Sequence, residues 1–156
     1  MPSLKISISK RPMRTGRVCG TRTARAERRR TADADHTFWL ACGIRIRPGD
    51  DDRSLAAFAA RNEGLFLLAE ENGHLVGSIL AGFDGRRGWL YHAATHPDER
   101  RRGIARTLVT LVEERLRALG CRKVNLIVWE ENAHAMRFWE AIGYRREAAV
   151  EYGKEL

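Results

Sequence analysis

An apolar stripe with helical spacing predicts a long amphipathic helix over residues 101–119. Its apolar residues follow one another at intervals of four, three, one, four and three positions, which places them on one helical face: Ile104, Leu108, Leu111, Val112, Leu116 and Leu119. Glu113 and Arg117 lie four residues apart and pair on the exposed side, and Gly120 is a typical helix end. The stripe needs a partner surface, and the preceding chain predicts a sheet.

Two β-hairpins are predicted in the middle of the chain. Apolar runs at 65–69 and 75–80 flank Glu71-Asn72-Gly73, and an Asn-Gly pair is typical of a tight hairpin turn because both residues accept a positive φ. A second turn at 84–88 leads into the next run, at 89–95.

The remaining pattern predicts short helices at 31–42 and 54–61, a strand at 123–129, a helix from Asn132 to Gly143, and a last strand or pair of strands over 144–152. Helices, antiparallel hairpins and then a β–α–β segment follow each other in this order. The sequence therefore predicts an α/β (α+β) fold with a mixed, mostly antiparallel central sheet and helices on both faces.

The positive charge is concentrated in an N-terminal arm. The whole chain carries a net charge of +8, but residues 1–30 hold ten Lys/Arg and one acid (+9), whereas residues 31–156 hold 18 Lys/Arg and 19 Asp/Glu (−1). We therefore divide the chain into an arm, 1–30, and a domain, 31–156, whose near-neutral charge argues against a nucleic-acid-binding core. The arm has three interpretations. It is a solvated tail, it supplies the first strand of the sheet (for example from 18–25), or it is an organelle transit peptide.

Composition narrows the class of protein further. No apolar run approaches the ~18–20 residues that span a membrane. Cys19, Cys42 and Cys121 form no C-x-x-C pair, which favours a reducing, cytoplasmic setting over a disulfide framework. The histidines show no metal-ligand spacing, and we assign no metal.

The segment from His96 to Ala105 carries the clearest chemistry. A proline-marked strand end runs through a basic loop into the long helix, so backbone N–H groups and the positive end of the helix dipole converge on one point. Three arginines there (100–102) oppose the dipole unless an anion is bound. A side chain at Gly103 would hold a phosphate away from the backbone, and Ala105 lets it sit close. The segment predicts a diphosphate site.

The chain also resembles the GNAT superfamily of acetyl-CoA-dependent N-acetyltransferases. Thr95-His96-Pro97 followed by residues 100–105 matches the core motif of a strand, x-x-Pro and Arg/Gln-x-x-Gly-x-Gly/Ala opening a helix. Residues 132–144 match its Asn-x-x-Ala-x-x-Phe-Tyr-Glu-x-x-Gly-Phe/Tyr block, and 82–88 resemble a segment of the YpeA-type subgroup. The three blocks cover about residues 65–150.

The resemblance implies a role for each matching position. Backbone amides of Arg101 to Ala105 would bind the CoA diphosphate, the end of the strand would bind the pantetheine and the thioester carbonyl, and Asn132 would bind the pantetheine or sulfur end. Asn132 is equally read as a helix N-cap. The implied cofactor-binding residues are Ala93, Ala94, Thr95, Arg100, Arg101, Arg102, Gly103, Ile104, Ala105, Asn132 and Phe138.

The general acid departs from the family pattern. Many members protonate the leaving thiolate with the Tyr of the Phe-Tyr-Glu triplet, where this chain has Trp139. An indole N–H is no useful proton donor, so Tyr144 is the substitute candidate beside its expected core role. A thiol with a pKa near ~8.5 leaves fairly well without an acid.

The general base has three candidates. His92 lies on the strand before the loop and has a suitable intrinsic pKa, although a surface or stacked histidine is an equal interpretation. Glu130 and Glu131 follow the next strand, where paired acids also favour a helix start.

The predicted function is transfer of the acetyl group from acetyl-CoA to a primary amine by direct attack in a ternary complex. The acceptor is a protein or peptide α-amine or a small-molecule amine. The alternatives are a catalytically weak CoA-binding regulatory domain and a nucleic-acid binder that uses the basic arm. The sequence leaves open whether the chain forms a homodimer.

Overall fold

The computed structural model describes residues 4–8 and 36–155. Internal contacts divide the chain into two compact units, Met1–Asn125 and Leu126–Leu156. The first unit holds nearly all of the sheet and the long helix, and the second holds the C-terminal helix.

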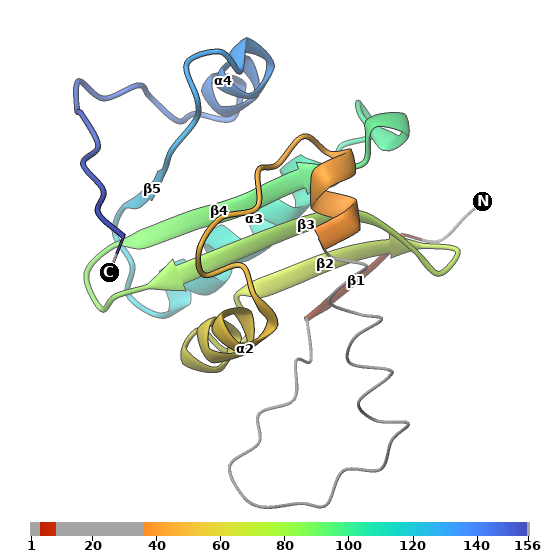
Figure 1. Cartoon of the computed structure of the whole chain (residues 1–156), viewed down its shortest axis with the longest axis horizontal. Helices are drawn as coiled ribbons and strands as arrows, with labels where there is room; N and C mark the ends of the chain where they lie inside the picture. The colour runs from red at the N-terminus through yellow and green to blue at the C-terminus, as the bar shows by residue number, and fades with distance from the viewer. Residues whose placement is uncertain (1–3, 9–35, 156) are drawn as a thin grey trace, which may run out of the picture. The chain divides into compact units, whose positions relative to one another are not determined.

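The sheet follows the chain in simple order (Figure 1). Its order is β1-β2-β3-β4-β5, and the pairs β1–β2, β2–β3 and β3–β4 are antiparallel. The strands are β1 (Lys5–Ile8), β2 (Phe66–Glu71), β3 (His74–Phe83), β4 (Gly88–Thr95) and β5 (Val124–Leu126). The chain reaches β5 from β4 through the helix α3, as a mixed sheet requires. The predicted fold class is confirmed.

The first strand comes from within the basic arm. Lys5–Ile8 pairs with β2, with Lys5 opposite Glu70 and Ile8 opposite Leu67. The segment 18–25, which we considered for this role, lies outside the described residues. The division into an arm, 1–30, and a domain, 31–156, stays a prediction.

The helix α3 (Ile104–Ala118) packs on one face of the sheet through the predicted stripe. Ile104, Leu108, Val112 and Leu116 are all buried, whereas Leu119 at the helix end is 55% exposed. A glycine on β3 allows the close approach, because a Cβ at Gly77 would lie 2.7 Å from Cγ2 of Ile104. The packing of α3 therefore fixes where its first turn lies relative to β3 and β4.

The opposite face is covered by a helical segment at 36–41 and by α2 (Asp52–Arg61), as Figure 1 shows. Their buried side chains form one cluster with the sheet: Phe38, Trp39, Leu55, Phe66, Leu80 and Ala94. Because both faces are covered, β2 and β3 read as nearly continuous apolar runs. Within the described ranges, no helix has both the length and the apolar character needed to cross a membrane.

The predicted turns and helix ends are largely confirmed. Asn72 and Gly73 both have positive φ (52° and 79°), as the Asn-Gly signal requires. The helix expected at 54–61 begins at Asp52, because Asp51 caps it by accepting hydrogen bonds from the N–H groups of Arg53 and Ser54. Of the helix expected at 31–42, residues 36–41 are helical and 31–35 lie outside the described residues.

The second unit contains α4 (Ala133–Ala141), which Asn132 caps as predicted. The prediction of one or two strands over 144–152 is wrong, since this segment has no regular secondary structure. Its apolar residues Val150 and Tyr152 are 78% and 93% exposed, and a strand without a ladder partner leaves its backbone groups to water. The strand expected at 123–129 is reduced to the three residues of β5.

Candidate active site

The N-terminus of α3 is open. Its N-cap is Gly103, which supplies no side-chain hydrogen bond, and the first turn contains no acidic residue. The N–H of Thr107 donates to the carbonyl of Gly103 at 3.0 Å, so the N–H groups of Ile104, Ala105 and Arg106 precede the first intrahelical bond. These amides and the positive end of the helix dipole are available to an anion.

Gly103 shapes this opening in two ways. Its φ of +80° is a left-handed conformation that favours glycine, and a Cβ placed on it would meet no protein atom within 4 Å. The space beside its backbone is therefore left open by the protein itself. Arg101, two residues earlier, also has a positive φ of 63°, a conformation that costs a non-glycine residue about 1–2 kcal/mol. Strain of this kind is concentrated at ligand-binding turns.

The loop is anchored to the end of β2 by Arg102. Its guanidinium donates two hydrogen bonds of 2.8 Å to the two carboxylate oxygens of Glu71, and a further one to Glu99. Hydrogen bonding to Arg102 lowers the pKa of Glu71, and the same bonds raise that of Arg102. The sequence offered three basic side chains to a polyanion; the side chain of Arg102 is instead engaged by two carboxylates, while Arg100 and Arg101 are exposed.

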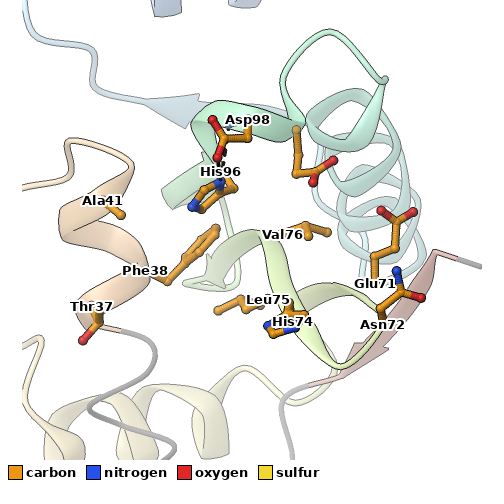
Figure 2. Close-up of a pocket in the computed structure, with 11 residues that line it drawn as sticks. Thr37, Phe38, Ala41, Glu71, Asn72, His74, Leu75, Val76, His96 and Asp98 are labelled. Carbon is orange, nitrogen blue, oxygen red and sulfur yellow. Dashed lines mark hydrogen bonds and ion pairs between the residues drawn. The ribbon is translucent and has the colours of Figure 1, made fainter. Parts of the chain in front are cut away.

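A cavity of about 660 Å³ lies beside this anchor (Figure 2). The helix at 36–41, the β2–β3 hairpin and the short 3-10 helix η1 (Pro97–Glu99) surround it. Phe38 stacks on His96 with ring centroids 6.5 Å apart, and Glu71 and Glu99, the carboxylates that bind Arg102, belong to its wall. The cavity combines an apolar floor with carboxylates and is unsuited to a phosphate.

His92 lies at an irregularity in β4. The register between β3 and β4 shifts between Ser78 and Leu80, and His92 has a positive φ of 49°. A bulge of this kind leaves one strand residue without its ladder partner. The carbonyl of His92 accepts a 2.9 Å hydrogen bond from the hydroxyl of Ser78, which itself accepts one of 3.0 Å from Nε1 of Trp39.

The imidazole of His92 is enclosed by two side chains. Its Nε2 lies 3.2 Å from Oδ2 of Asp50, an electrostatic contact rather than an aligned hydrogen bond, and its ring centroid lies 4.3 Å from that of Trp39. The side chain keeps 14% of its surface exposed. A histidine paired with a carboxylate and still reached by solvent has the environment of a general base.

The end of β4 contributes one further unusual group. Oγ1 of Thr95 is buried and has no hydrogen-bond partner within the described part of the chain. Ala94 is buried in the core cluster and Ala93 is exposed. The predicted interactions of these three positions with pantetheine use backbone groups and stay predictions.

The second unit holds the other sequence-predicted residues. Glu130 is 90% exposed and pairs with Arg146 at 3.3 Å, and Glu131 is also exposed. Oδ1 of Asn132 accepts from the N–H of Ala135 at 3.0 Å, so its role as an N-cap is present. Tyr144 packs edge-on against Trp139, with centroids 5.0 Å apart, and Trp139 also contacts Phe138.

Comparison with known proteins decides the family. A family model described as Acetyltransferase (GNAT) family matches residues 17–144. An acetyltransferase of Pectobacterium atrosepticum is 38% identical over 121 residues, covering 77% of this chain and 85% of that protein. The chain belongs to the acetyltransferase (GNAT) family.

Solved structures agree with this assignment at the level of fold. The PaiA N-acetyltransferase of Thermoplasma acidophilum, in complex with coenzyme A, superposes with a TM-score of 0.69 at 18% identity, covering 95% of this chain and 93% of that one. The ribosomal-protein-S18-alanine N-acetyltransferase of Escherichia coli gives 0.63 at 17% identity, over 94% and 80%. This GNAT protein is an N-acetyltransferase with acetyl-CoA as its cosubstrate. Its YpeA-type subgroup stays a prediction.

The residues of the GNAT chain fit the cosubstrate. Acetyl-CoA carries a diphosphate, and the open amides at α3 with the empty space beside Gly103 suit that group. When bound, acetyl-CoA supplies an activated thioester.

Two site residues were missed by sequence reasoning. Asp50 stands in the run of acids from 50 to 52, which reads as a polar turn, and Glu71 reads as part of a hairpin turn. Their partners, His92 and Arg102, are 42 and 31 residues away along the chain. No local pattern marks such long-range pairs.

Proposed function

We propose that this enzyme transfers the acetyl group of acetyl-CoA to a primary amine by direct attack within a ternary complex. The observation that carries the proposal is the uncapped, glycine-opened N-terminus of α3. In this proposal the backbone amides of residues 101–105 bind the diphosphate, with the exposed side chains of Arg100 and Arg101 adding charge. Ala93, Ala94 and Thr95 contact the pantetheine arm and the thioester. The contacts that the family resemblance implies for Asn132 and Phe138 stay predictions.

His92 is the proposed general base. It is partly enclosed and paired with a carboxylate, whereas Glu130 is almost fully exposed and pairs with Arg146. As the amine nitrogen bonds to the thioester carbonyl carbon, its proton passes to the imidazole. Collapse of the tetrahedral intermediate breaks the C–S bond, and CoA leaves as a thiolate that takes a proton from the imidazolium or from water. Tyr144, whose ring packs on Trp139, is not needed for this step.

An amine of low pKa is the proposed acceptor. Deprotonating a lysine ammonium at pH 7 costs about 4–5 kcal/mol, whereas an α-amine costs only about 1 kcal/mol. A site with Trp139 in place of the usual tyrosine acid suits the less demanding substrate. Among proteins of similar fold, one is named for the alanine of a ribosomal protein and another for aminoglycosides, so the fold serves both protein and small-molecule amines.

An acceptor panel tests the reaction. The purified protein is incubated at pH 7 with acetyl-CoA and either a lysine-free peptide with a free N-terminus, Nα-acetyl-lysine or an aminoglycoside, and thiol release and product mass are followed. We expect the peptide α-amine to react at least about ten-fold faster than the lysine side chain. Faster acetylation of Nα-acetyl-lysine would refute the acceptor class, and no thiol release with any amine would refute the transfer.

A matched pair of glycine variants tests the proposed diphosphate site at the N-terminus of α3. Gly103 and Gly120 have φ of +80° and +85°, and a Cβ would meet nothing within 4 Å at either position. Gly103→Ala and Gly120→Ala therefore add similar backbone strain, but only Gly103→Ala narrows the proposed diphosphate site. We expect calorimetry to show an acetyl-CoA Kd raised about ten-fold or more for Gly103→Ala and unchanged for Gly120→Ala. Equal affinities of the two variants for acetyl-CoA would refute the proposed diphosphate site.

The nucleic-acid alternative depends on the arm, most of which lies outside the described residues. A salt-dependent DNA affinity that disappears on deletion of residues 1–30 would support it.

A further inference from the structure

We infer that Asp50 is a positioning residue for the base in acetyl transfer: its buried carboxylate holds Nε2 of His92 so that Nδ1 receives the proton of the acceptor amine. This inference rests on the proposed function, in which His92 is the base.

The environment of Asp50 separates it from the acids beside it. Asp51 caps α2 with its exposed carboxylate, and Asp52 lies exposed in the first turn of that helix. Asp50 is only 7% exposed. A buried carboxylate is costly unless it is paired and hydrogen-bonded, so its partners explain why it is there.

The partners of Asp50 lead to the imidazole. Oδ2 accepts a 2.8 Å hydrogen bond from the backbone N–H of Arg47, and the same oxygen lies 3.2 Å from Nε2 of His92. The backbone carbonyl of Asp50 lies 2.6 Å from Nε2 of His36, which further fixes the loop. One amide steadies the carboxylate, and the carboxylate then faces a histidine on the bulge of β4.

The backbone of His92 is also held in place by its neighbours. Its carbonyl is bound by Ser78, which Trp39 binds in turn, and the Trp39 ring covers the imidazole. Its positive φ persists only because the surroundings determine it. These contacts hold His92 at both its backbone and its ring. A base that takes a proton from a bound amine needs such a fixed orientation.

The chemistry follows from the pairing. The negative carboxylate 3.2 Å from Nε2 favours the neutral tautomer with its proton on Nε2, which leaves Nδ1 unprotonated. Within 4–8 and 36–155, Nδ1 makes no hydrogen bond. Nδ1 takes the proton of the amine as the new C–N bond forms and the C–S bond later breaks. The negative carboxylate stabilises the imidazolium during this interval, as a buried aspartate does in hydrolytic triads.

A double-mutant cycle tests this role. The variants Asp50→Asn, His92→Gln and the double variant are assayed with acetyl-CoA and the α-amine peptide, alongside Asp51→Ala as a destabilised control from the same loop. We expect Asp50→Asn to lower kcat about 10- to 100-fold with the KM for acetyl-CoA unchanged within about two-fold. In the His92→Gln background the same change should cost less than about two-fold. Asp51→Ala should lower Tm and leave kcat unchanged at temperatures below the transition.

The outcomes separate the two claims. If His92→Gln retains full kcat, both the proposed base and this inference fail. If His92→Gln is impaired but Asp50→Asn is not, or if Asp50→Asn costs the same factor in both backgrounds, only the inference fails, because a purely structural role acts without His92.

A measurement on the unmodified enzyme covers the case in which Asp50→Asn does not fold. Long-range ¹H–¹⁵N spectra of the imidazole, assigned by comparison with His92→Gln, should show a protonated Nε2 and an unprotonated Nδ1 in the neutral form. Protonation at Nδ1 would overturn the inference.

Discussion

Two helices of the same unit begin in opposite ways. At α2 the carboxylate of Asp51 accepts hydrogen bonds from the first amides, and Asp52 adds a second negative charge to the first turn. At α3 a left-handed glycine stands at the same position, no side chain caps the amides, and the first turn contains no acid. Two of the first amides of α2 find an acceptor in Asp51, whereas no side chain caps the amides of α3. In the proposed function the amides of α3 bind the diphosphate of acetyl-CoA, so the contrast is between a structural helix start and a proposed binding one.

Giving α3 the charge of a structural start should have the largest effect. We expect Gly103→Asp to raise the Kd for acetyl-CoA about 100-fold or more, because the carboxylate repels the diphosphate and occupies the open space. Aspartate tolerates a left-handed φ better than most residues, so the fold should persist. Calorimetry gives the Kd and circular dichroism the fold; undiminished acetyl-CoA binding by a folded variant contradicts the contrast.

Releasing the loop from β2 should have a smaller effect. We expect Arg102→Gln to raise the Kd for acetyl-CoA about three- to ten-fold, because the bidentate pair with Glu71 no longer fixes the loop before α3. Glu71→Gln should act similarly. The double variant, measured by the same titration, should bind no more weakly than the weaker single variant, since the two side chains act as one pair. Strictly additive losses would show that Arg102 contacts the ligand directly.

Removing the cap of α2 should affect stability alone. We expect Asp51→Ala to lower Tm by about 2–4 °C, because amides of the first turn lose their acceptor. Acetyl-CoA affinity should not change. Thermal unfolding and calorimetry check both halves, and a weakened acetyl-CoA affinity would mean that the two helix starts are not independent.

The smallest expected effect is on the stability of the protein at low pH. Because Arg102 holds the pKa of Glu71 below its usual range, the pair stabilises the fold above the unfolded-state pKa of about 4.3, and this contribution is lost as pH falls through the lower folded value. Urea unfolding should therefore show a midpoint gap between the unmodified protein and Glu71→Gln at pH 6 that narrows below about pH 4. A gap of constant size would exclude this pair as its cause.

The sequence predicted the parts of the fold that local patterns determine. The apolar stripe of α3 has the period of a helix, and the Asn72-Gly73 pair accepts the positive φ angles that a tight turn requires. Both elements are confirmed. The strand expected after Gly143 is wrong because alternation cannot show whether a partner strand is present. The loop before α3 could be predicted as a diphosphate site because its glycine and arginines are contiguous, and this assignment stays a prediction.

What the sequence could not reveal are pairs formed across the fold. Among the acids from 50 to 52, only tertiary packing decides which one is buried, and here it is Asp50. The basic loop offers three arginines, and only the position of Glu71 at the end of β2 decides that Arg102 is the one engaged. The role proposed for His92 and the anchoring of the loop by Arg102 depend on these partners.

Hydrogen bonds from Trp39 through Ser78 to the carbonyl of His92 link the proposed base to the helical segment 36–41. Phe38 and Trp39 of this segment are buried in the core cluster, so packing against the sheet holds the segment in place. Loosening of that helix on warming would release the bulge in β4 while the rest of the sheet stays folded. With His92 as the proposed base, activity would then be lost on warming before the sheet unfolds.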